Sequence, residues 1–292
     1  MTRSSRGARG GRGVSTRTTR RIRIFFATVC GLLLASPLLY MVAGSLMSNT
    51  QLSVQPPQVI PSSFHFANYS DAFSGITQVI QPRSFLNSVI FTVGAVGLQW
   101  VLCISGGLVV AKMRFRSRNL ITAMFAISLF IPLITTLIPT FIVTYELRMI
   151  NTYPGLILPI AAQTGFGTLL FRQYIGQMPE ELFDAARIDG ATWWTIFRRL
   201  AVPLAKPATA AYFAISVLTA WNMYLWPLVA AEGGSLQVLT QTLAVVGTTS
   251  QGEVTPQNVI FASVVIVTLP MILVFIAVQR AFIRGLTGSG VE

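Results

Sequence analysis

The residues of this chain that could take part in chemistry lie in one charged stretch, 178–207, which reads MPEELFDAARIDGATWWTIFRRLAVPLAKP. Four side chains in it recur at the i, i+3, i+4 and i+7 positions of a helix and so share one face: Leu182, Ala185, Ala186 and Asp189. That face offers one large apolar group, two methyl groups and a terminal carboxylate. Its small side chains would let a helix enter a cleft. This pattern predicts that the helix lies in the aqueous phase and docks to a partner protein.

Local signals predict where this helix begins and ends. Pro179 suits the first helical turn, and Glu180 and Glu181 follow where the helix dipole favours negative charge. Gly190 can adopt the left-handed conformation that stops a helix. The expected helix therefore runs over about 180–190.

A second helix is expected directly afterwards, from Thr192 as its cap to Pro203, with Pro207 opening the next apolar run. It combines aromatic and aliphatic side chains with two arginines: Trp193, Trp194, Ile196, Phe197, Arg198 and Arg199. This composition is typical of a helix lying on a membrane surface. The first helix fits that interpretation poorly, because Ala185 and Ala186 offer little apolar area.

Catalysis and metal binding have little support in the sequence. The single histidine, His65, has no cysteine or acidic cluster near it, and Cys30 and Cys103 both fall inside apolar runs. No nucleophile with a base and no GxxxxGK[ST] phosphate-binding loop is present. We therefore expect no catalytic residue, no metal site and no cofactor in this chain.

The composition indicates a polytopic membrane protein. Hydrophobic residues make up 53% of the chain and charged residues 10%, with a mean hydropathy of +0.65. A soluble domain would be about a quarter charged. Runs of about 20 apolar residues predict six membrane spans. These spans are placed at 24–47, 85–111, 119–145, 155–175, 207–230 and 258–283.

The positive charge is distributed by side of the membrane. If the N-terminus is cytoplasmic, 19 of the 21 Lys and Arg residues lie on the cytoplasmic side, and only Arg83 and Arg148 lie outside. This asymmetry predicts that both termini are cytoplasmic. The net charge of +12 then reflects orientation, and we expect no nucleic-acid partner.

Three regions follow from this topology. Residues 1–22 form a basic cytoplasmic tail, expected to be disordered because it has no apolar face to bury. Residues 23–286 form the six-helix domain, with the charged loop at 176–206, and 287–292 form a short tail. External loops are expected at 48–84 and 231–257.

Polar and helix-breaking residues inside the spans suggest a water-lined path, although ordinary helix packing would also explain them. Prolines fall in the third, fourth and sixth spans, and small residues in the second span allow close helix approach: Gly94, Gly97, Ser105, Gly106 and Gly107. The candidate path residues are Asn87, Gln163, Trp221, Asn222 and Tyr224. Trp221 and Tyr224 equally fit an aromatic belt at the membrane interface. Because the spans have almost no ionisable residues, a neutral or polar solute is expected.

The segments PEELFDAARIDGA and IFRRLAVPL resemble the EAA motif of ATP-binding-cassette (ABC) importer permeases, in the form of the maltose-system second-subunit class of carbohydrate permeases. The resemblance extends over 25–286, through FLNSVIFTVGAVG, AKMRFRSRNL, MINTYPGLILP, WNMYLWPLV and VQRAFIRGLTG. Within that class, TLLFRQYI, WNMYLWPL and QRAFIRGL are most similar to permeases of glycerol-3-phosphate importers. The chain departs at Asp184, where the family usually has glutamate.

The resemblance implies an all-α membrane protein of the type I ABC importer permease fold, in the plasma (inner) membrane. The chain would pair with a homologous permease, two ATPase subunits that bind ATP and Mg²⁺, and an extracytoplasmic solute-binding protein. The implied coupling helix contacts the ATPase through Glu181, Leu182, Asp184, Ala185, Ala186, Asp189 and Gly190. Glycerol-3-phosphate, or a glycerophosphodiester such as glycerophosphocholine, is the implied solute. A sugar or oligosaccharide importer is the alternative, and a stand-alone carrier or channel fits less well.

Overall fold

The computed structural model describes residues 16–54, 56, 58–74, 79–232, 234–245 and 255–287, and these residues form helices joined by turns without any strand. The helices in chain order are α1 (Thr16–Gly44), α2 (Asn49–Leu52), α3 (Ala67–Ser74), α4 (Pro82–Lys112), α5 (Arg118–Ser128), α6 (Leu133–Glu146), α7 (Tyr153–Ala161), α8 (Gly165–Gly176), α9 (Glu180–Ile188), α10 (Trp193–Ile196), the π-helical η1 (Phe197–Ala201), α11 (Val202–Leu204), α12 (Lys206–Trp221), α13 (Leu225–Ala230), α14 (Leu239–Val245) and α15 (Gln257–Thr287).

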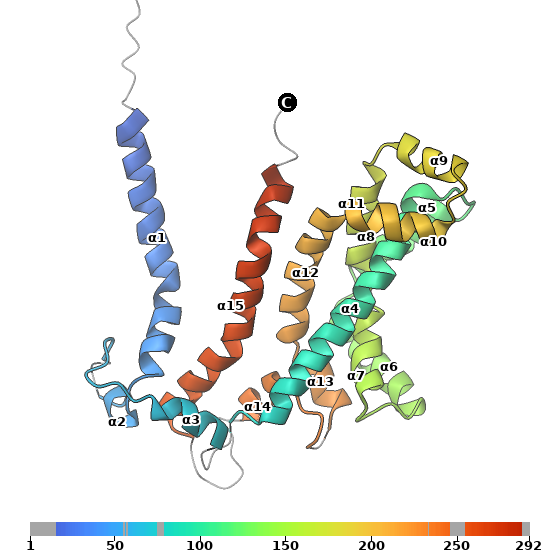
Figure 1. Ribbon diagram of the computed structural model, residues 1–292. Helices are drawn as coiled ribbons and strands as arrows, with labels where there is room; N and C mark the ends of the chain where they lie inside the picture. Colours follow the sequence, from blue (N-terminus) through green and yellow to red (C-terminus); the bar gives the residue numbers. More distant parts are fainter. Residues whose placement is uncertain are drawn as a thin grey trace, which may run out of the picture.

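Three helices are long and apolar enough to cross a membrane, over Thr19–Gly44, Pro82–Lys112 and Gln257–Ala277. They coincide with the first, second and sixth predicted spans. Figure 1 shows them running in the same general direction, with the smaller helices α2, α3 and α14 gathered at one end. The number of candidate spans among the described residues rises to six if each bent helix pair counts as one.

Each of the three remaining predicted spans consists of two helices, in line with the helix-breaking residues inside them. The run 119–145 is α5 followed by α6, bent by 105°, and the run 155–175 is α7 followed by α8, bent by 47°. Pro132 caps α6 and disfavours a helical conformation in Ile131, so α5 cannot continue through it. The run 207–230 is α12 and α13, interrupted at 222–224.

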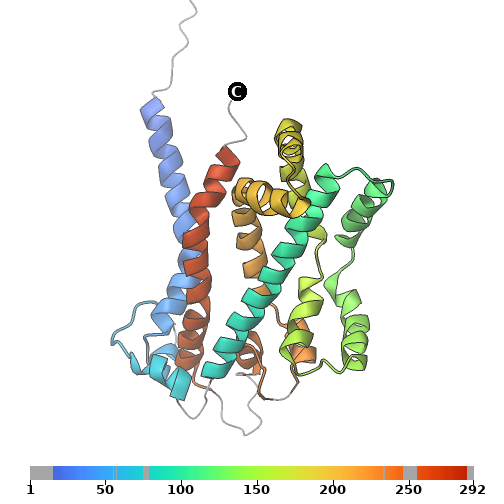
Figure 2. The same ribbon diagram turned by 45° about the vertical axis from the view of Figure 1, so that its right-hand side comes forward.

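Another bend separates the charged segment from the bundle. Trp193–Leu204 and Lys206–Trp221 meet at 76°. The short helices α10, η1 and α11 therefore run across the end of the bundle, while α12 runs along it (Figure 2).

Helix α4 packs against α7, α8 and α12, and its contact with α8 is the most extensive in the described structure. A Cβ added to Gly107 would lie 2.5 Å from the Cβ of Phe171 and 2.9 Å from the backbone nitrogen of Arg172. At Gly167, on α8, an added Cβ would lie 2.5 Å from the sulfur of Cys103. The predicted close approach is thus confirmed at Gly107, whereas Gly97 faces open space.

The charged segment is part of the hydrophobic core. One buried cluster joins side chains of α4 and α8 to side chains of the 176–206 segment: Leu108, Phe171, Ile175, Phe183, Ile196, Ala201 and Ala205. Because these groups exclude water together, the segment is fixed to the bundle rather than hanging from it.

The opposite end is closed by the predicted external loops. Asn68 on α3 donates two hydrogen bonds from its amide nitrogen, to the carbonyl oxygens of Ser45 and Met47, at 2.9 and 2.8 Å. Asn258 on α15 donates to the amide oxygen of Asn68 at 2.8 Å. His65 lies exposed in this region, and no group of three or more potential metal ligands occurs among the described residues.

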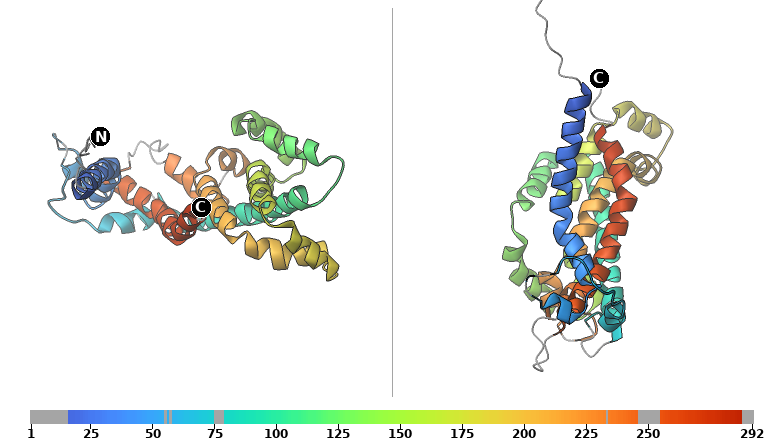
Figure 3. Two further views of the ribbon diagram at one scale, coloured as in Figure 1. Left: turned by 90° about the horizontal axis from the view of Figure 1, so that it is seen from above. Right: turned by 90° about the vertical axis from the view of Figure 1, so that its left-hand side faces the viewer.

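The described ends of the chain, at Thr16 and Thr287, lie at the same end of the molecule as α9 (Figure 1). Helix α1 begins within the predicted 1–22 tail, whose residues 1–15 lie outside the described structure, as do 288–292. Seen along the helices the molecule is elongated, with α1 at one end (Figure 3). Helix α1 touches α15, where Tyr40 and Phe261 meet edge to face at 5.9 Å, and is otherwise exposed.

Candidate functional site

Helix α9 has the sharp ends that its sequence predicts. Pro179 takes the position just before the helix, one residue earlier than expected, and Glu180 and Glu181 occupy the first turn. At the other end Ala191 and Gly190 donate backbone hydrogen bonds to Ala186 and Arg187, at 2.9 and 3.0 Å. This is a Schellman motif, and it requires the φ of +77° that Gly190 adopts.

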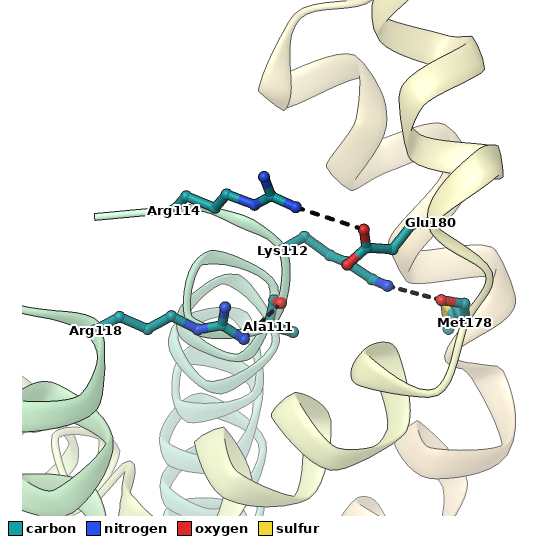
Figure 4. A network of polar contacts seen from close by, with 6 residues as sticks. All are labelled: Ala111, Lys112, Arg114, Arg118, Met178 and Glu180. Atoms are coloured by element: carbon teal, nitrogen blue, oxygen red, sulfur yellow. Dashed lines mark hydrogen bonds and ion pairs between the residues drawn. The ribbon is translucent and has the colours of Figure 1, made fainter. Parts of the chain in front are cut away.

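The inner side of α9 is anchored by Phe183, which is only 4% exposed and belongs to the core cluster with α4 and α8. The ammonium nitrogen of Lys112, in the last turn of α4, donates to the carbonyl oxygen of Met178 at 2.7 Å (Figure 4). The same nitrogen lies 4.7 Å from the centre of the Phe183 ring. Neither Phe183 nor Lys112 was among the predicted site residues. The sequence signal that could have indicated the inner side is the i, i+3 and i+4 spacing of Phe183, Ala186 and Arg187, which places these three residues on one helix face.

A second charged contact adds little. Arg114 and Glu180 form an ion pair at 3.8 Å with side chains 89% and 70% exposed. Such an exposed pair contributes about 0–1 kcal/mol. The position of α9 therefore depends mainly on the buried ring and on the part-buried lysine. These groups also line a cavity of about 520 Å³ between α4, α9 and α10.

The outer side of α9 is exposed and centres on Glu181, Ala185 and Ile188, spaced i, i+4 and i+7. Ile188 is 85% exposed, and Leu182 at the edge of this face is 44% exposed. We call the docking face the following exposed residues of α9 and of its C-terminal cap: Glu181, Leu182, Asp184, Ala185, Ile188 and Asp189. Ala186 instead packs against the core cluster, so it points toward the bundle, away from the predicted docking side.

The charge of α9 is opposite to that of the chain. Four of the nine acidic residues of the chain lie within ten positions, at Glu180, Glu181, Asp184 and Asp189, although the chain carries a net charge of +12. An exposed isoleucine with carboxylates at Asp184 and Asp189, four positions before it and one after it, fits a basic groove with an apolar floor.

The connection from α9 back to the bundle is tightly packed. Thr192 caps α10 by accepting a 3.3 Å hydrogen bond from the backbone of Thr195, as predicted. The helix then widens into the π-helical η1 and continues beyond the expected stop at Pro203 to Leu204. The π-helical η1 ends two residues before Pro203, which has no N–H to donate to the preceding turn. Ile196 is buried in the core cluster, so this connection is packed against the end of α8.

Two of the predicted path residues are packed inside the protein. Asn87 is 1% exposed; its amide nitrogen donates to the carbonyl oxygens of Ser235 and Gln237, at 3.0 and 2.9 Å, and its amide oxygen accepts from Tyr153 at 2.8 Å. Trp221 is buried and donates to the carbonyl oxygen of Val267 at 3.2 Å. In this conformation both side chains join helices and loops, and neither is open to a solute.

The other three lie at helix breaks. Gln163 is exposed between α7 and α8 and lines a cavity of about 680 Å³. Asn222 and Tyr224 lie between α12 and α13; Asn222 is exposed and Tyr224 is half-buried. The Asn222 amide nitrogen donates to the carbonyl oxygen of Leu218 at 2.9 Å. Irregular backbone at membrane depth is tolerated where it is buried in protein or lines a water-filled cavity.

Gln99 holds the break between α7 and α8. Its amide nitrogen donates to the carbonyl oxygen of Gln163 at 2.6 Å, and its amide oxygen accepts from the Tyr212 hydroxyl at 2.7 Å. The Gln99 side chain of α4 thus connects Tyr212 of α12 to the carbonyl oxygen of Gln163, which lies at the break between α7 and α8. Gln99 was not among the predicted path residues.

The described structure thus has three long apolar helices, further apolar runs divided between bent helix pairs, and the charged helix α9 packed at one end. Residues 104–288 match the family model described as "Binding-protein-dependent transport system inner membrane component", and the chain belongs to this family. It is a multi-pass inner-membrane permease subunit of an ABC importer.

The chain is 37% identical over 208 residues to the sn-glycerol-3-phosphate transport system permease protein UgpE of Salmonella typhi, covering 71% of this chain and 72% of the relative. It is 30% identical over 259 residues to UgpE of Brucella abortus (strain 2308), covering 87% and 91%. These matches confirm the resemblance to glycerol-3-phosphate permeases.

Two solved structures share the fold. A chain from a bacterial ABC transporter that imports the acidic polysaccharide alginate superposes with a TM-score of 0.80 at 22% identity, covering 92% of this chain and 98% of the other. A chain of a bacterial alginate ABC transporter in complex with an alginate pentasaccharide-bound periplasmic protein gives 0.61 at 16% identity, covering 94% and 97%. The predicted importer-permease fold is thereby confirmed.

Proposed function

We propose that this chain is one of two homologous permease subunits of an importer for glycerol-3-phosphate or a glycerophosphodiester such as glycerophosphocholine, with both termini in the cytoplasm. The names of the relatives support the solute. The one-sided distribution of Lys and Arg supports the orientation, because the chain ends and α9 lie at the same end of the molecule.

The observation that carries the proposal is the contrast between the two sides of α9. Phe183 is buried against the bundle, while Ile188 is exposed among carboxylates. A helix fixed on one side and unsatisfied on the other is suited to transmit a partner's movement. The proposed partner is an ATPase subunit, one for each of the two permeases, and it binds the ATP and Mg²⁺. The relevant physics is a two-state bundle whose equilibrium the ATPase biases.

Further partners follow from the exposed apolar surfaces. Helices α1 and α6 expose large aliphatic side chains over most of their length, and lipid together with the second permease would cover them. A binding protein on the other side of the membrane would deliver the solute to the end formed by α2, α3 and α14. Gln163, Asn222 and Tyr224 are the residues we propose for the path.

A sugar or oligosaccharide importer is the second candidate. The observation that favours it is that Gln163, Asn222 and Tyr224 are all uncharged, which suits hydroxyl groups better than phosphate. If the solute carries a phosphate, its charge must be met by the partner permease or by the binding protein.

The test is uptake by membranes containing the whole importer and its binding protein. We expect ATP-dependent uptake of glycerol-3-phosphate or glycerophosphocholine and no uptake of a neutral disaccharide. Uptake of the disaccharide alone would transfer the assignment to the sugar class. Purification distinguishes the carrier class: an importer permease brings an ATPase and a related permease with it, whereas a carrier or channel is isolated by itself.

A further inference from the structure

A small basic cavity lies apart from the docking face and from the helix breaks. It has a volume of about 280 Å³ and is formed where α4 ends, α5 begins and α8 ends; its lining residues are Ala111, Arg118, Arg172, Gln173, Gly176 and Gln177. None of these side chains is acidic. The cavity therefore has two guanidinium groups and two amides with no negative side chain among them.

Arg118 is held in place by the end of α4. Its Nε donates to the carbonyl oxygen of Val110 at 2.7 Å, and one terminal nitrogen donates to the carbonyl oxygen of Ala111 at 3.0 Å. Figure 4 shows the guanidinium lying across this helix end. Since a guanidinium has five N–H donors, these two bonds orient the group and leave donors for a ligand.

Arg172 lacks a partner altogether within the described residues. Its Nε is buried and has no hydrogen-bond acceptor, and no carboxylate lies within ion-pair distance of either Arg172 or Arg118. The Arg172 side chain is half-buried, and an anion bound at this point would give its buried Nε the acceptor that it lacks. The partial negative charge at the end of α4, about half a unit, is too small to balance two guanidinium groups.

The surroundings indicate what carries the anion. Helix α5 starts at Arg118, has no buried residue, and exposes Leu120 and Ile127 along its length. A ligand whose charged group lies in the cavity would thus have an exposed apolar helix beside it. Basic pockets between membrane-spanning helices on the cytoplasmic side are suited to lipid head groups. Guanidinium pairs recognise phosphate oxygens in particular.

We propose that the Arg118–Arg172 cavity binds a phosphate group, and that an anionic phospholipid of the cytoplasmic leaflet supplies it. This proposal rests on the proposed function in one respect: the proposed orientation places the cavity at the cytoplasmic leaflet. The site differs from the solute path in its residues and in its place at the end of the bundle.

The test uses the assembled importer, freed of lipid and titrated with phosphatidylglycerol or phosphatidylcholine, with bound lipid counted by native mass spectrometry. We expect the wild type to prefer phosphatidylglycerol and Arg172→Gln to bind it about tenfold more weakly, as loss of a charge-assisted contact implies. Arg172→Lys keeps the charge and should show a smaller loss. It is the variant to measure if Arg172→Gln does not assemble.

Arg116→Gln is the matched control, because Arg116 is exposed in the turn just before Arg118 and does not line the cavity. A parallel titration with inorganic phosphate identifies the source. If inorganic phosphate displaces the lipid and stabilises wild type but not Arg172→Gln, the phosphate group is the ligand and a soluble phosphate is its source. Equal binding of phosphatidylglycerol and of inorganic phosphate by wild type and both Arg172 variants would overturn the proposal. Because the readout is bound lipid, a failed solute assignment would not affect it.

Discussion

The ammonium group of Lys112 lies 4.7 Å from the centre of the Phe183 ring and 2.7 Å from the carbonyl oxygen of Met178, joining the last turn of α4 to the start of α9. Helix α4 spans the bundle and packs against α7, α8 and α12. A displacement of α9 therefore acts on α4 directly, in addition to the route through α10 and α12. Lys112 is a positioning residue in this account.

Replacing Lys112 by methionine should weaken that link while keeping an apolar side chain over Phe183. The lost contacts amount to about 1–3 kcal/mol, the range for a charge-assisted hydrogen bond. We expect solute transported per ATP hydrolysed to fall several-fold, with the ATPase still bound, and Lys112→Arg to restore most of it. Arg114→Met is the control, because its exposed ion pair contributes little. Equal coupling in Lys112→Met and wild type would remove the residue from this role.

Ile188 is expected to be an energetic centre of the docking face. Ile188→Ser changes an exposed side chain, so the free energy of unfolding should change by no more than about 0.5 kcal/mol. A buried apolar anchor in an interface contributes about 1–2 kcal/mol or more, so ATPase association should weaken by about tenfold. Val59→Ser, at an exposed position outside the 176–206 segment, should leave association unchanged. Undiminished ATPase recovery with Ile188→Ser would contradict the docking face.

Two glycines of α4 offer a matched test of helix packing. Gly107→Ala places a methyl group against Phe171 and the α8 backbone and should destabilise the protein by about 1–3 kcal/mol. Gly97→Ala meets no atom within 4 Å and should be neutral or stabilising, by up to about 1 kcal/mol. Thermal unfolding of the purified complex separates the two. A lower melting temperature for Gly97→Ala than for Gly107→Ala would contradict this packing.

Asn87 and Asn222 should respond differently although both are asparagines in predicted spans. Asn87→Ala leaves the carbonyl groups of Ser235 and Gln237 without their donor, so we expect lower protein abundance and an unchanged KM for uptake. Asn222→Ala breaks one bond within its own helix, so abundance should persist while the KM rises. The opposite pattern would place Asn87, and not Asn222, in the path.

The parts of this structure that depend only on residues adjacent in the sequence could be predicted. The stop at Gly190 and the cap at Thr192 are local conformational preferences, and both were predicted. The first, second and sixth spans depend only on length and apolar composition.

What the sequence could not supply were the contacts between distant segments. The bonds from Asn87 to Ser235 and Gln237 join α4 to the 231–257 loop, and nothing local distinguishes them from contacts with a solute. The sequence did not show that Phe183 and Ala186 face the bundle, because Phe183 and Leu182 are both apolar and only the packing against α4 and α8 shows which is buried. Pro132 marked a helix break, but the 105° bend depends on how α6 packs.

The most direct test of the central claim is cross-linking from Ile188→Cys in the assembled importer, with Cys30→Ser to remove the half-buried native thiol and with the buried Cys103 retained. We expect a cross-link to the ATPase subunit whose yield changes when ATP is bound, and no cross-link from Ala186→Cys, because Ala186 faces the bundle. An Ile188→Cys protein that is labelled only by lipid-phase reagents, or that cross-links to no nucleotide-hydrolysing subunit, would contradict it.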